Sequence, residues 1–323
     1  MASSRPSDTK EKKTGKQKAR SGQKAAAATG RTLADPRMVR LAVPNKGRIA
    51  VPIMDLLEKS GLHVPESGSE RRLITRTLDP LVEILFARPV DIPEYVATGA
   101  ADLGITGHDM VVERGSDVAE LLDLKIGKAT LVLAVHDESG IRSVKDLKGA
   151  KVATEFPAIA RNYFAKNKVP VSIVRVGGAC EATPQLGIAD AIVDLTSSGT
   201  TLRTNRLRVI EEVLTTSTFL IANTGSLAGK RDKIDEIVLA LESVVRARGQ
   251  CYLMMNVKRS CLDAVKKVLP GLAGPTVMDV ASTQDLVAVH AVVSEERVYT
   301  LINALKRAGA RDILVMGIQR MIR

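Results

Sequence analysis

Three carboxylates surround one short apolar segment near the middle of the chain. The segment runs from Ala189 to Leu195, and the acids are Glu181, Asp190 and Asp194. A hydroxyl-rich turn follows, which we call the phosphate turn: Thr196, Ser197, Ser198, Gly199, Thr200 and Thr201. At a strand-to-helix junction, such a turn leaves backbone N–H groups at a helix N-terminus, where the partial positive charge favours a phosphate. Acids facing that phosphate would repel it, so we expect them to hold sugar hydroxyls or a metal ion. The combination predicts a phosphorylated sugar as ligand.

Three other loops place charged side chains where predicted strands end. In chain order these loops carry Lys46-Gly47-Arg48, Arg88 and Asp109. Open α/β sheets bind ligands at the carboxyl ends of their strands, and a glycine between two cations there favours phosphate binding over a solvated loop. For Arg88 an ion pair with Asp91 is an equal alternative, and Asp109 could equally serve only as a helix cap. Asp190 and Asp194 could likewise be ordinary caps, although we favour ligand contact.

The apolar pattern predicts an α/β fold with one lobe inserted into another. With four Tyr, four Phe and no Trp, the cores must consist mainly of aliphatic side chains, which suits parallel sheets covered by helices. Predicted strands cover 38–43, 82–87, 102–106, 130–135, 151–154, 171–176, 189–195 and 219–222, and predicted helices cover 49–59, 92–98, 144–147 and 158–166. Two crossing strands would join the lobes, so we expect a cleft that closes over a small anionic molecule.

The pattern changes beyond Asn223. A long amphipathic helix is predicted at 231–248. A strand (252–257), a helix (261–269), two strands (276–280 and 287–292), a helix (295–308) and a strand (312–318) follow it. This order, βαββαβ, is typical of a ferredoxin-like domain. Its sequence contains no obvious catalytic cluster.

Composition limits the remaining function classes. The formal charge is +11, and the first 35 residues hold nine Lys and Arg against three acids, so we expect residues 1–36 to be a disordered basic tail. Without interleaved aromatic residues, nucleic-acid binding by this tail is disfavoured. No apolar run is long enough for a membrane span and no export signal is recognised, which predicts a cytoplasmic protein. Three widely spaced cysteines favour free thiols over disulfides or a zinc site.

Five motifs in one order resemble those of the ATP phosphoribosyltransferases. The strongest is Glu181-x5-Gly187-x-Ala189-Asp190-x-Ile192-x-Asp194, followed by Ser198-Gly199-x-Thr201-Leu202, and it is similar to the family's phosphoribosyl pyrophosphate signature. The other four motifs are Val43–Arg48, Arg88–Pro93, Asp102–Asp109 and Lys151–Pro157. The C-terminal unit resembles the family's histidine-binding regulatory domain, which separates the long form from the short form. The resemblance covers nearly everything from Met38 to Arg323.

The resemblance implies the first reaction of histidine biosynthesis. N1 of ATP would join C1 of 5-phosphoribosyl 1-pyrophosphate with release of pyrophosphate, assisted by Mg²⁺. It further implies a two-lobed catalytic region like a type II periplasmic binding protein, inhibition by histidine and a homo-oligomer, from dimer to hexamer. The implied division is a tail (1–36), a first lobe (37–127 and 211–226), a second lobe (128–210) and a regulatory domain (227–323).

The resemblance also implies roles for individual residues. Asp194, Asp190 and Glu181 would be catalytic carboxylates at the ribose, and the phosphate turn would hold the 5′-phosphate. Lys46, Gly47, Arg48 and Arg88 would contact phosphates, Asp109 would lie near the second nucleotide, and Asp109 or Asp194 could hold a metal ion. Leu272 would belong to the histidine site.

Two other classes of protein share parts of this pattern. A two-lobed solute-binding protein would trap an anion without chemistry, but it would normally carry an export signal. A purely regulatory binding module would use the ferredoxin-like domain as its sensor, but it would not need catalytic-type loops. Pyrophosphate release that depends on both substrates separates the enzyme from these alternatives.

Overall fold

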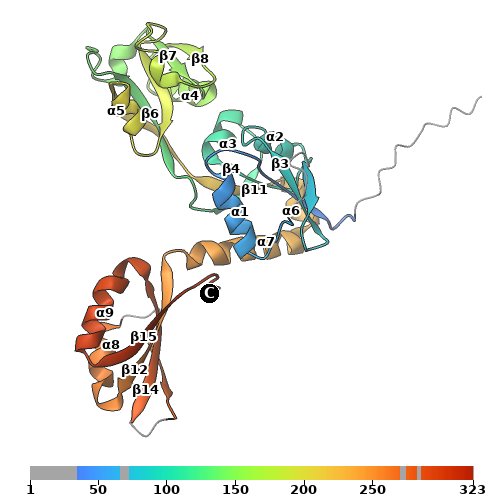
Figure 1. The fold of residues 1–323 in the computed structure, drawn as a ribbon. Coiled ribbons are helices and arrows are strands. Elements are labelled where there is room, and N and C mark those ends of the chain that lie inside the picture. Colours follow the sequence, from blue (N-terminus) through green and yellow to red (C-terminus); the bar gives the residue numbers. More distant parts are fainter. Residues whose placement is uncertain (1–34, 66–72, 270–273, 282–284, 323) are drawn as a thin grey trace, which may run out of the picture. The chain divides into compact units, whose positions relative to one another are not determined.

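The computed structural model describes residues 35–65, 73–269, 274–281 and 285–322 (Figure 1). The described residues from Arg37 onward belong to one unit. Most of the predicted tail and Leu272 therefore lie outside the described residues. Within the described ranges, no helix is both long enough and apolar enough to cross a membrane.

Six strands form the first sheet, in the order β2-β3-β1-β4-β11-β5. They are β1 (Val39–Pro44), β2 (Ile74–Arg76), β3 (Val82–Ala87), β4 (Leu103–Gly107), β5 (Ala119–Asp123) and β11 (Thr218–Ala222). β3, β1 and β4 run parallel, and β11 runs antiparallel to β4 and β5. On one face Leu41 of β1 packs with α1 (Ala50–Lys59) and α7 (Arg231–Ala247). On the other face Ala42 packs with α2 (Ile92–Ala97) and α3 (His108–Arg114).

Five strands form the second sheet, in the order β10-β6-β9-β7-β8. They are β6 (Ala129–His136), β7 (Lys151–Thr154), β8 (Ser172–Arg175), β9 (Ala191–Thr196) and β10 (Leu207–Thr216), packed with η1 (Val144–Leu147) and α4 (Pro157–Lys166). β8, β7 and β9 run parallel, while β6 runs antiparallel to β9 and β10. The series β3-β1-β4-β11-β5 and β8-β7-β9-β6-β10 therefore have the same arrangement. This repeat confirms the two-lobed α/β architecture of the type II periplasmic binding proteins.

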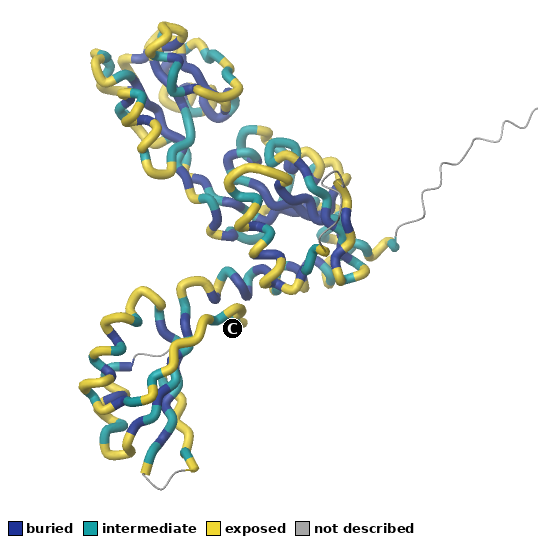
Figure 2. Tube along the Cα trace, in the orientation of Figure 1, coloured by how far each residue is buried: buried dark blue, intermediate teal, exposed yellow. Residues whose placement is uncertain are grey.

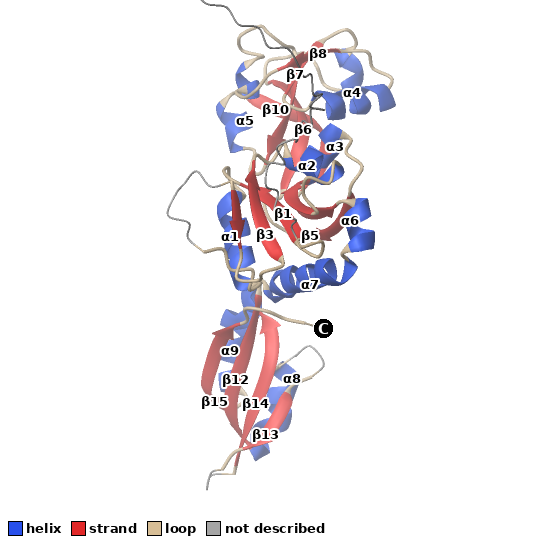
Figure 3. Cartoon of the chain, turned by 90° about the vertical axis from the view of Figure 1, so that its right-hand side faces the viewer, coloured by secondary structure: helices blue, strands red, loops and turns tan. Residues whose placement is uncertain are grey.

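Four antiparallel strands form the third sheet, in the order β13-β14-β12-β15 (Figure 3). They are β12 (Gln250–Lys258), β13 (Thr276–Asp279), β14 (Leu286–Ser294) and β15 (Ala310–Gly317). Alternate residues of β12 and β14 are buried against α8 (Leu262–Val268) and α9 (Val298–Arg307), and Figure 2 shows buried residues gathered along the strands. This domain is the predicted ferredoxin-like unit.

Among the described residues, the strands β2, β5 and β10 and the helix α6 (Thr224–Gly229) were absent from the sequence prediction. β10 was not recognised as a strand because two register shifts interrupt its pairing with β6 and break the alternation of apolar side chains. It also crosses position 210, where the second lobe was expected to end. The division of the chain into lobes stays a prediction.

The segment after β15 returns to the elements that cover the first sheet. Nε of Arg320 donates to the carbonyl of Lys59, the last residue of α1, at 2.6 Å. The amide of Met321 donates to the carbonyl of Ser243 in α7 at 2.8 Å. Gly61, just beyond α1, has φ +83°, and a Cβ there would lie 2.5 Å from Nη2 of Arg320.

Replacing Gly61 with alanine should destabilise the protein by roughly 1–2 kcal/mol. The positive φ strains an L side chain, and the new Cβ would displace the Arg320 guanidinium from Lys59. Chemical denaturation measures the loss. The Arg320→Ala variant already lacks the hydrogen bond to Lys59, so Gly61→Ala should lower the free energy of unfolding less in that variant than in the wild type. An equal loss in both proteins would show that displacement of the guanidinium contributes nothing.

Candidate functional site

The carboxyl ends of β7 and β9 bring two acids to the same level of the second sheet. Thr154 lies opposite Val193 in this parallel pair, and the residues that follow them are Glu155 and Asp194. Oγ1 of Thr154 donates to the carbonyl of Val193 at 2.7 Å and accepts from the amide of Phe156 at 2.9 Å, which fixes the turn that carries Glu155. Glu155 had no predicted role, although it stood in one of the five motifs.

Asp194 is the most perturbed carboxylate of the candidate site. Burial raises its pKa, the negative charges of Glu181 and Glu155 act in the same direction, and the resulting pKa is about 6. A hydrogen bond of 2.8 Å from the amide of Leu195 to Oδ1 opposes the rise. Glu181 comes from the short turn η2 (Cys180–Ala182). The three acids repel one another, so a positive charge that arrived among them would be strongly stabilised.

Asp190 does not join this group. It precedes β9, and its Oδ2 accepts a hydrogen bond of 2.8 Å from the amide of Lys151, the first residue of β7. Three residues of strand lie between it and Asp194, so four steps along the strand put the two residues about 13 Å apart. The structure therefore brings Glu181 and Asp194 together but places Asp190 at the opposite end of the strand, where it binds backbone.

The phosphate turn follows β9 as predicted and leads into α5 (Thr200–Thr204). Gly199 adopts φ +70°, and its amide donates to Oγ1 of Thr196 at 2.9 Å. The hydroxyls of Ser198 and Thr200 lie 3.0 Å apart. Hydroxyl groups of the turn thus bond to one another and to a backbone amide that could serve a phosphate.

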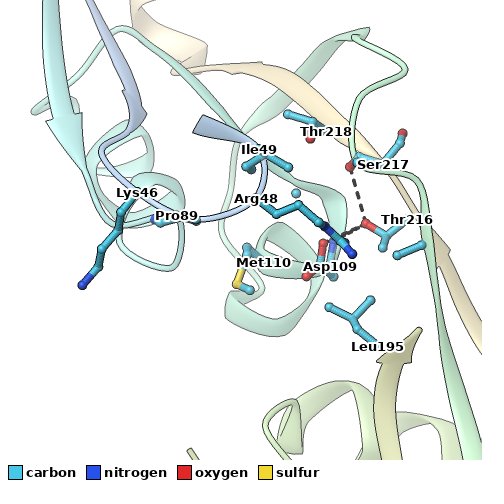
Figure 4. Close-up of a pocket in the computed structure, with 14 residues that line it drawn as sticks. Lys46, Arg48, Ile49, Pro89, Asp109, Met110, Leu195, Thr216, Ser217 and Thr218 are labelled. Atoms are coloured by element: carbon cyan, nitrogen blue, oxygen red, sulfur yellow. Dashed lines mark hydrogen bonds between the residues drawn. The ribbon is translucent and has the colours of Figure 1, made fainter. Parts of the chain in front are cut away.

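A first cavity, of about 190 Å³, lies between the loop before α1 and Leu195, the residue that precedes the phosphate turn (Figure 4). Lys46, Gly47, Arg48 and Asp109 line it, together with Leu195, Thr216 and neighbouring residues. Nη1 of Arg48 donates to Oγ of Ser197 at 3.3 Å. In Figure 4 the guanidinium of Arg48 lies beside Asp109, whereas the ammonium of Lys46 points away from it. Arg48 is therefore the cation of this loop that reaches the phosphate turn.

Asp109 is both a cavity-lining residue and a structural one. It is 5% exposed, burial raises its pKa, and its Oδ1 accepts a hydrogen bond of 2.8 Å from Oγ1 of Thr216. Nδ1 of the neighbouring His108 lies 2.6 Å from Oε1 of Glu120 in β5. His108 is therefore not among the residues that line the cavity.

Arg88 lies at a second cavity, together with Glu113, Glu155 and Arg175. Met110 lines both cavities, so they adjoin each other along α3. Asp91, considered as an ion-pair partner of Arg88, instead lies 3.8 Å from Arg114. Its side chain also forms no capping hydrogen bond with α2, although it occupies the expected N-cap position.

Comparison with known proteins decides the family. A family model described as "ATP phosphoribosyltransferase" matches residues 88–243, and one described as "HisG, C-terminal domain" matches residues 247–320. An ATP phosphoribosyltransferase of Methanocella arvoryzae is 57% identical over 286 residues, which are 88% of this chain and all of the relative. An ATP phosphoribosyltransferase of Methanosarcina barkeri is 52% identical over 289 residues, with the same coverage.

The chain belongs to the ATP phosphoribosyltransferase family. It is thus a pentosyltransferase of the first step of histidine biosynthesis. A solved "ATP phosphoribosyl transferase (HisG:HisZ) complex from Thermotoga maritima" has a chain that is 28% identical, with a TM-score of 0.58. The match covers 65% of this transferase and 99% of that chain. The additional C-terminal domain identifies the long form.

The transferase has no dedicated metal cage among its described residues. No group of three or more His, Cys, Asp or Glu side chains there could hold a metal ion. Mg²⁺ usually takes only one or two protein carboxylates and completes its shell with water and substrate phosphates. The acids beside β9 fit that requirement. Burial and the neighbouring acids raise the pKa of the Cys180 thiol, and its Sγ donates to the carbonyl of Ala153 at 3.3 Å, which disfavours the thiolate that a nucleophile requires.

Asp194→Asn should make the ligand-free transferase more stable at pH 8, by roughly 1–2 kcal/mol. The pKa of Asp194 is higher in the folded chain than in the unfolded chain, so the wild type loses stability as pH rises from about 4 through about 6. The variant has no ionisable group at this position and does not have this loss. The amide oxygen of Asn can still accept from Leu195. Denaturant titrations at pH 8 and pH 4.5 measure the difference, which should shrink at the lower pH. A variant less stable than wild type at pH 8 would contradict this account.

Proposed function

We propose that Asp194, with Glu181 and Glu155, stabilises the positive charge that develops on ribose as pyrophosphate leaves phosphoribosyl pyrophosphate. The observation that carries the proposal is the position of Asp194, inside a group of mutually repelling acids and two residues before the phosphate turn. A cationic sugar in this place relieves repulsion that the ligand-free site contains. Such differential stabilisation lowers the barrier of the chemical step.

The other residues bind and orient the substrates. The phosphate turn receives the 5′-phosphate, whose oxygens replace the hydroxyl contacts of Thr196 and Ser198, and Arg48 adds a positive charge at the same place. N1 of adenine already carries a lone pair, so the reaction needs no strong general base, and positioning of the two substrates supplies much of the acceleration. Asp190 has no part in this proposal.

Mg²⁺ is the proposed metal, and one or two of Asp194, Glu181 and Glu155 would hold it together with substrate phosphates. It would supply positive charge that neutralises the leaving pyrophosphate. Asp109 is the weaker candidate because burial and the bond from Thr216 already engage its carboxyl group.

Feedback inhibition by histidine and assembly into a homo-oligomer, from dimer to hexamer, extend the proposal. The domain that contains the third sheet, which matches the family's C-terminal domain, would carry this regulation. Leu272 stays a proposed contact for histidine.

Asp194→Asn should reduce kcat at least 100-fold, because the charge beside the ribose cation is lost. The measurement is release of pyrophosphate from ATP, phosphoribosyl pyrophosphate and Mg²⁺ by the full-length chain. Asp190→Asn is the matched control, being the same substitution next to the same strand, and it should retain kcat within a factor of about three. Equal losses in both variants would refute the assignment, and a wild type that binds both substrates without turnover would support the solute-binding alternative.

The kcat/KM for phosphoribosyl pyrophosphate should fall as pH drops through about 6, since protonation removes the charge of Asp194. The substrate phosphate also titrates in this range, so the comparison is between wild type and Asp194→Asn under identical conditions. The wild-type profile should have a steeper acid limb than the variant. Superimposable profiles would show that ionised Asp194 is not required.

A further inference from the structure

The second cavity, of about 470 Å³, is larger than the first and collects charges from both lobes. It is lined by Arg88, Glu113, Arg114, Glu155 and Arg175, with Met110 and other residues between them. Arg88 follows β3 of the first sheet, and Arg175 is the last residue of β8 in the second. Both therefore lie at carboxyl strand ends, the positions at which open α/β sheets bind ligands.

Two of these five charges are already paired. The carboxylate of Glu113 accepts hydrogen bonds from the amides of Ala158 and Ile159 at 2.9–3.0 Å, so it occupies the N-terminus of α4. Arg114 lies 3.8 Å from Asp91. A carboxylate thus already occupies the N-terminus of α4, and one of the three arginines, Arg114, already lies near an acid.

The guanidinium groups of Arg88 and Arg175 are different. Among the described residues, neither forms a side-chain hydrogen bond or an ion pair, and both are exposed. Arg175 lies opposite Thr154 in the parallel pair of β8 and β7, so it is one position from Glu155. The negative charge of Glu155 also raises the pKa of Asp194, so the two acids lie close to each other. The cavity thus offers two unpaired arginines, beside the acids where the ribose is proposed to bind.

We propose that this cavity is the polyphosphate subsite of the transferase and that Arg175, together with Arg88, binds its phosphates. Guanidinium groups match phosphate oxygens in pairs, and the volume suits a linear polyphosphate. Arg175 lies outside all five motifs that resemble the family. The inference rests on the proposed function, because a leaving pyrophosphate or the triphosphate of ATP is the occupant that the reaction supplies.

The test is calorimetric titration of the full-length chain with magnesium pyrophosphate and, separately, with magnesium ATP. Arg175→Ala and Arg88→Ala should each weaken at least one ligand ten-fold or more, and Arg175→Lys should recover part of the loss. Arg142→Ala is the matched control: this exposed arginine of the same lobe lines neither cavity and should bind like wild type. Unchanged circular dichroism and melting temperature show that each variant is folded.

The two ligands distinguish the two sources of polyphosphate. A loss confined to pyrophosphate, with a raised KM for phosphoribosyl pyrophosphate and little change in kcat, assigns the cavity to the leaving group. A loss confined to ATP, with a raised KM for ATP, assigns it to the triphosphate. Arg175→Ala and Arg88→Ala variants that bind both ligands as Arg142→Ala does would overturn the subsite. Failure of the proposed function would look different, because the wild type itself would then release no pyrophosphate from the two substrates.

Discussion

The repulsion among Asp194, Glu181 and Glu155 is the interaction on which the site depends. Burial and these neighbours bring the pKa of Asp194 to about 6, so near neutral pH the folded chain holds a charge that its surroundings disfavour. Hydrophobic packing of the second sheet has to offset that cost, because none of the described residues pairs with this carboxylate as a cation. A strained electrostatic arrangement is useful to an enzyme when the transition state relieves it.

The fold creates this arrangement by repeating one strand order twice. In each sheet the parallel strands end at the same edge, which places Arg88 at the end of β3, and Glu155, Arg175 and Asp194 at β7, β8 and β9. Short contacts then hold the two sets of loops: Arg48 reaches Ser197, and Glu113 of α3 receives the amides at the start of α4. Met110 lines both cavities and therefore lies at the boundary between them.

Most strands and helices followed from apolar periodicity, whereas the detail of the site depended on register. Asp190 and Asp194 look equivalent in the sequence because both border one apolar segment, and only the pairing of Lys151 with Asp190 shows that they lie at opposite ends of β9. The signal for Glu155 was present, since it follows a predicted strand within a motif. Arg175 had no such signal in the sequence, because only the structure shows that the neighbouring Glu113 and Arg114 are paired while, among the described residues, Arg175 is not. β10 was missed for a related reason, as its irregular pairing removes the alternation that identifies a strand.

Acids and unpaired arginines lie next to each other in this site, and their positions determine which part of a substrate each group attracts. Both substrates carry polyphosphates, and a polyphosphate placed among the β9 acids would be repelled, whereas the same group beside Arg88 and Arg175 would be attracted. In the proposed site, the sugar would bind beside the acids both because its developing positive charge is attracted there and because the polyphosphate is repelled from that position. If the leaving pyrophosphate is the occupant of the arginine cavity, the proposed site would place the ribose cation beside Asp194 and the departing phosphates toward the arginines, and it would favour the separated charges over the intact substrate. Glu155 lines the same cavity as Arg88 and Arg175, so magnesium bound to the polyphosphate would reduce the repulsion between the phosphates and this acid.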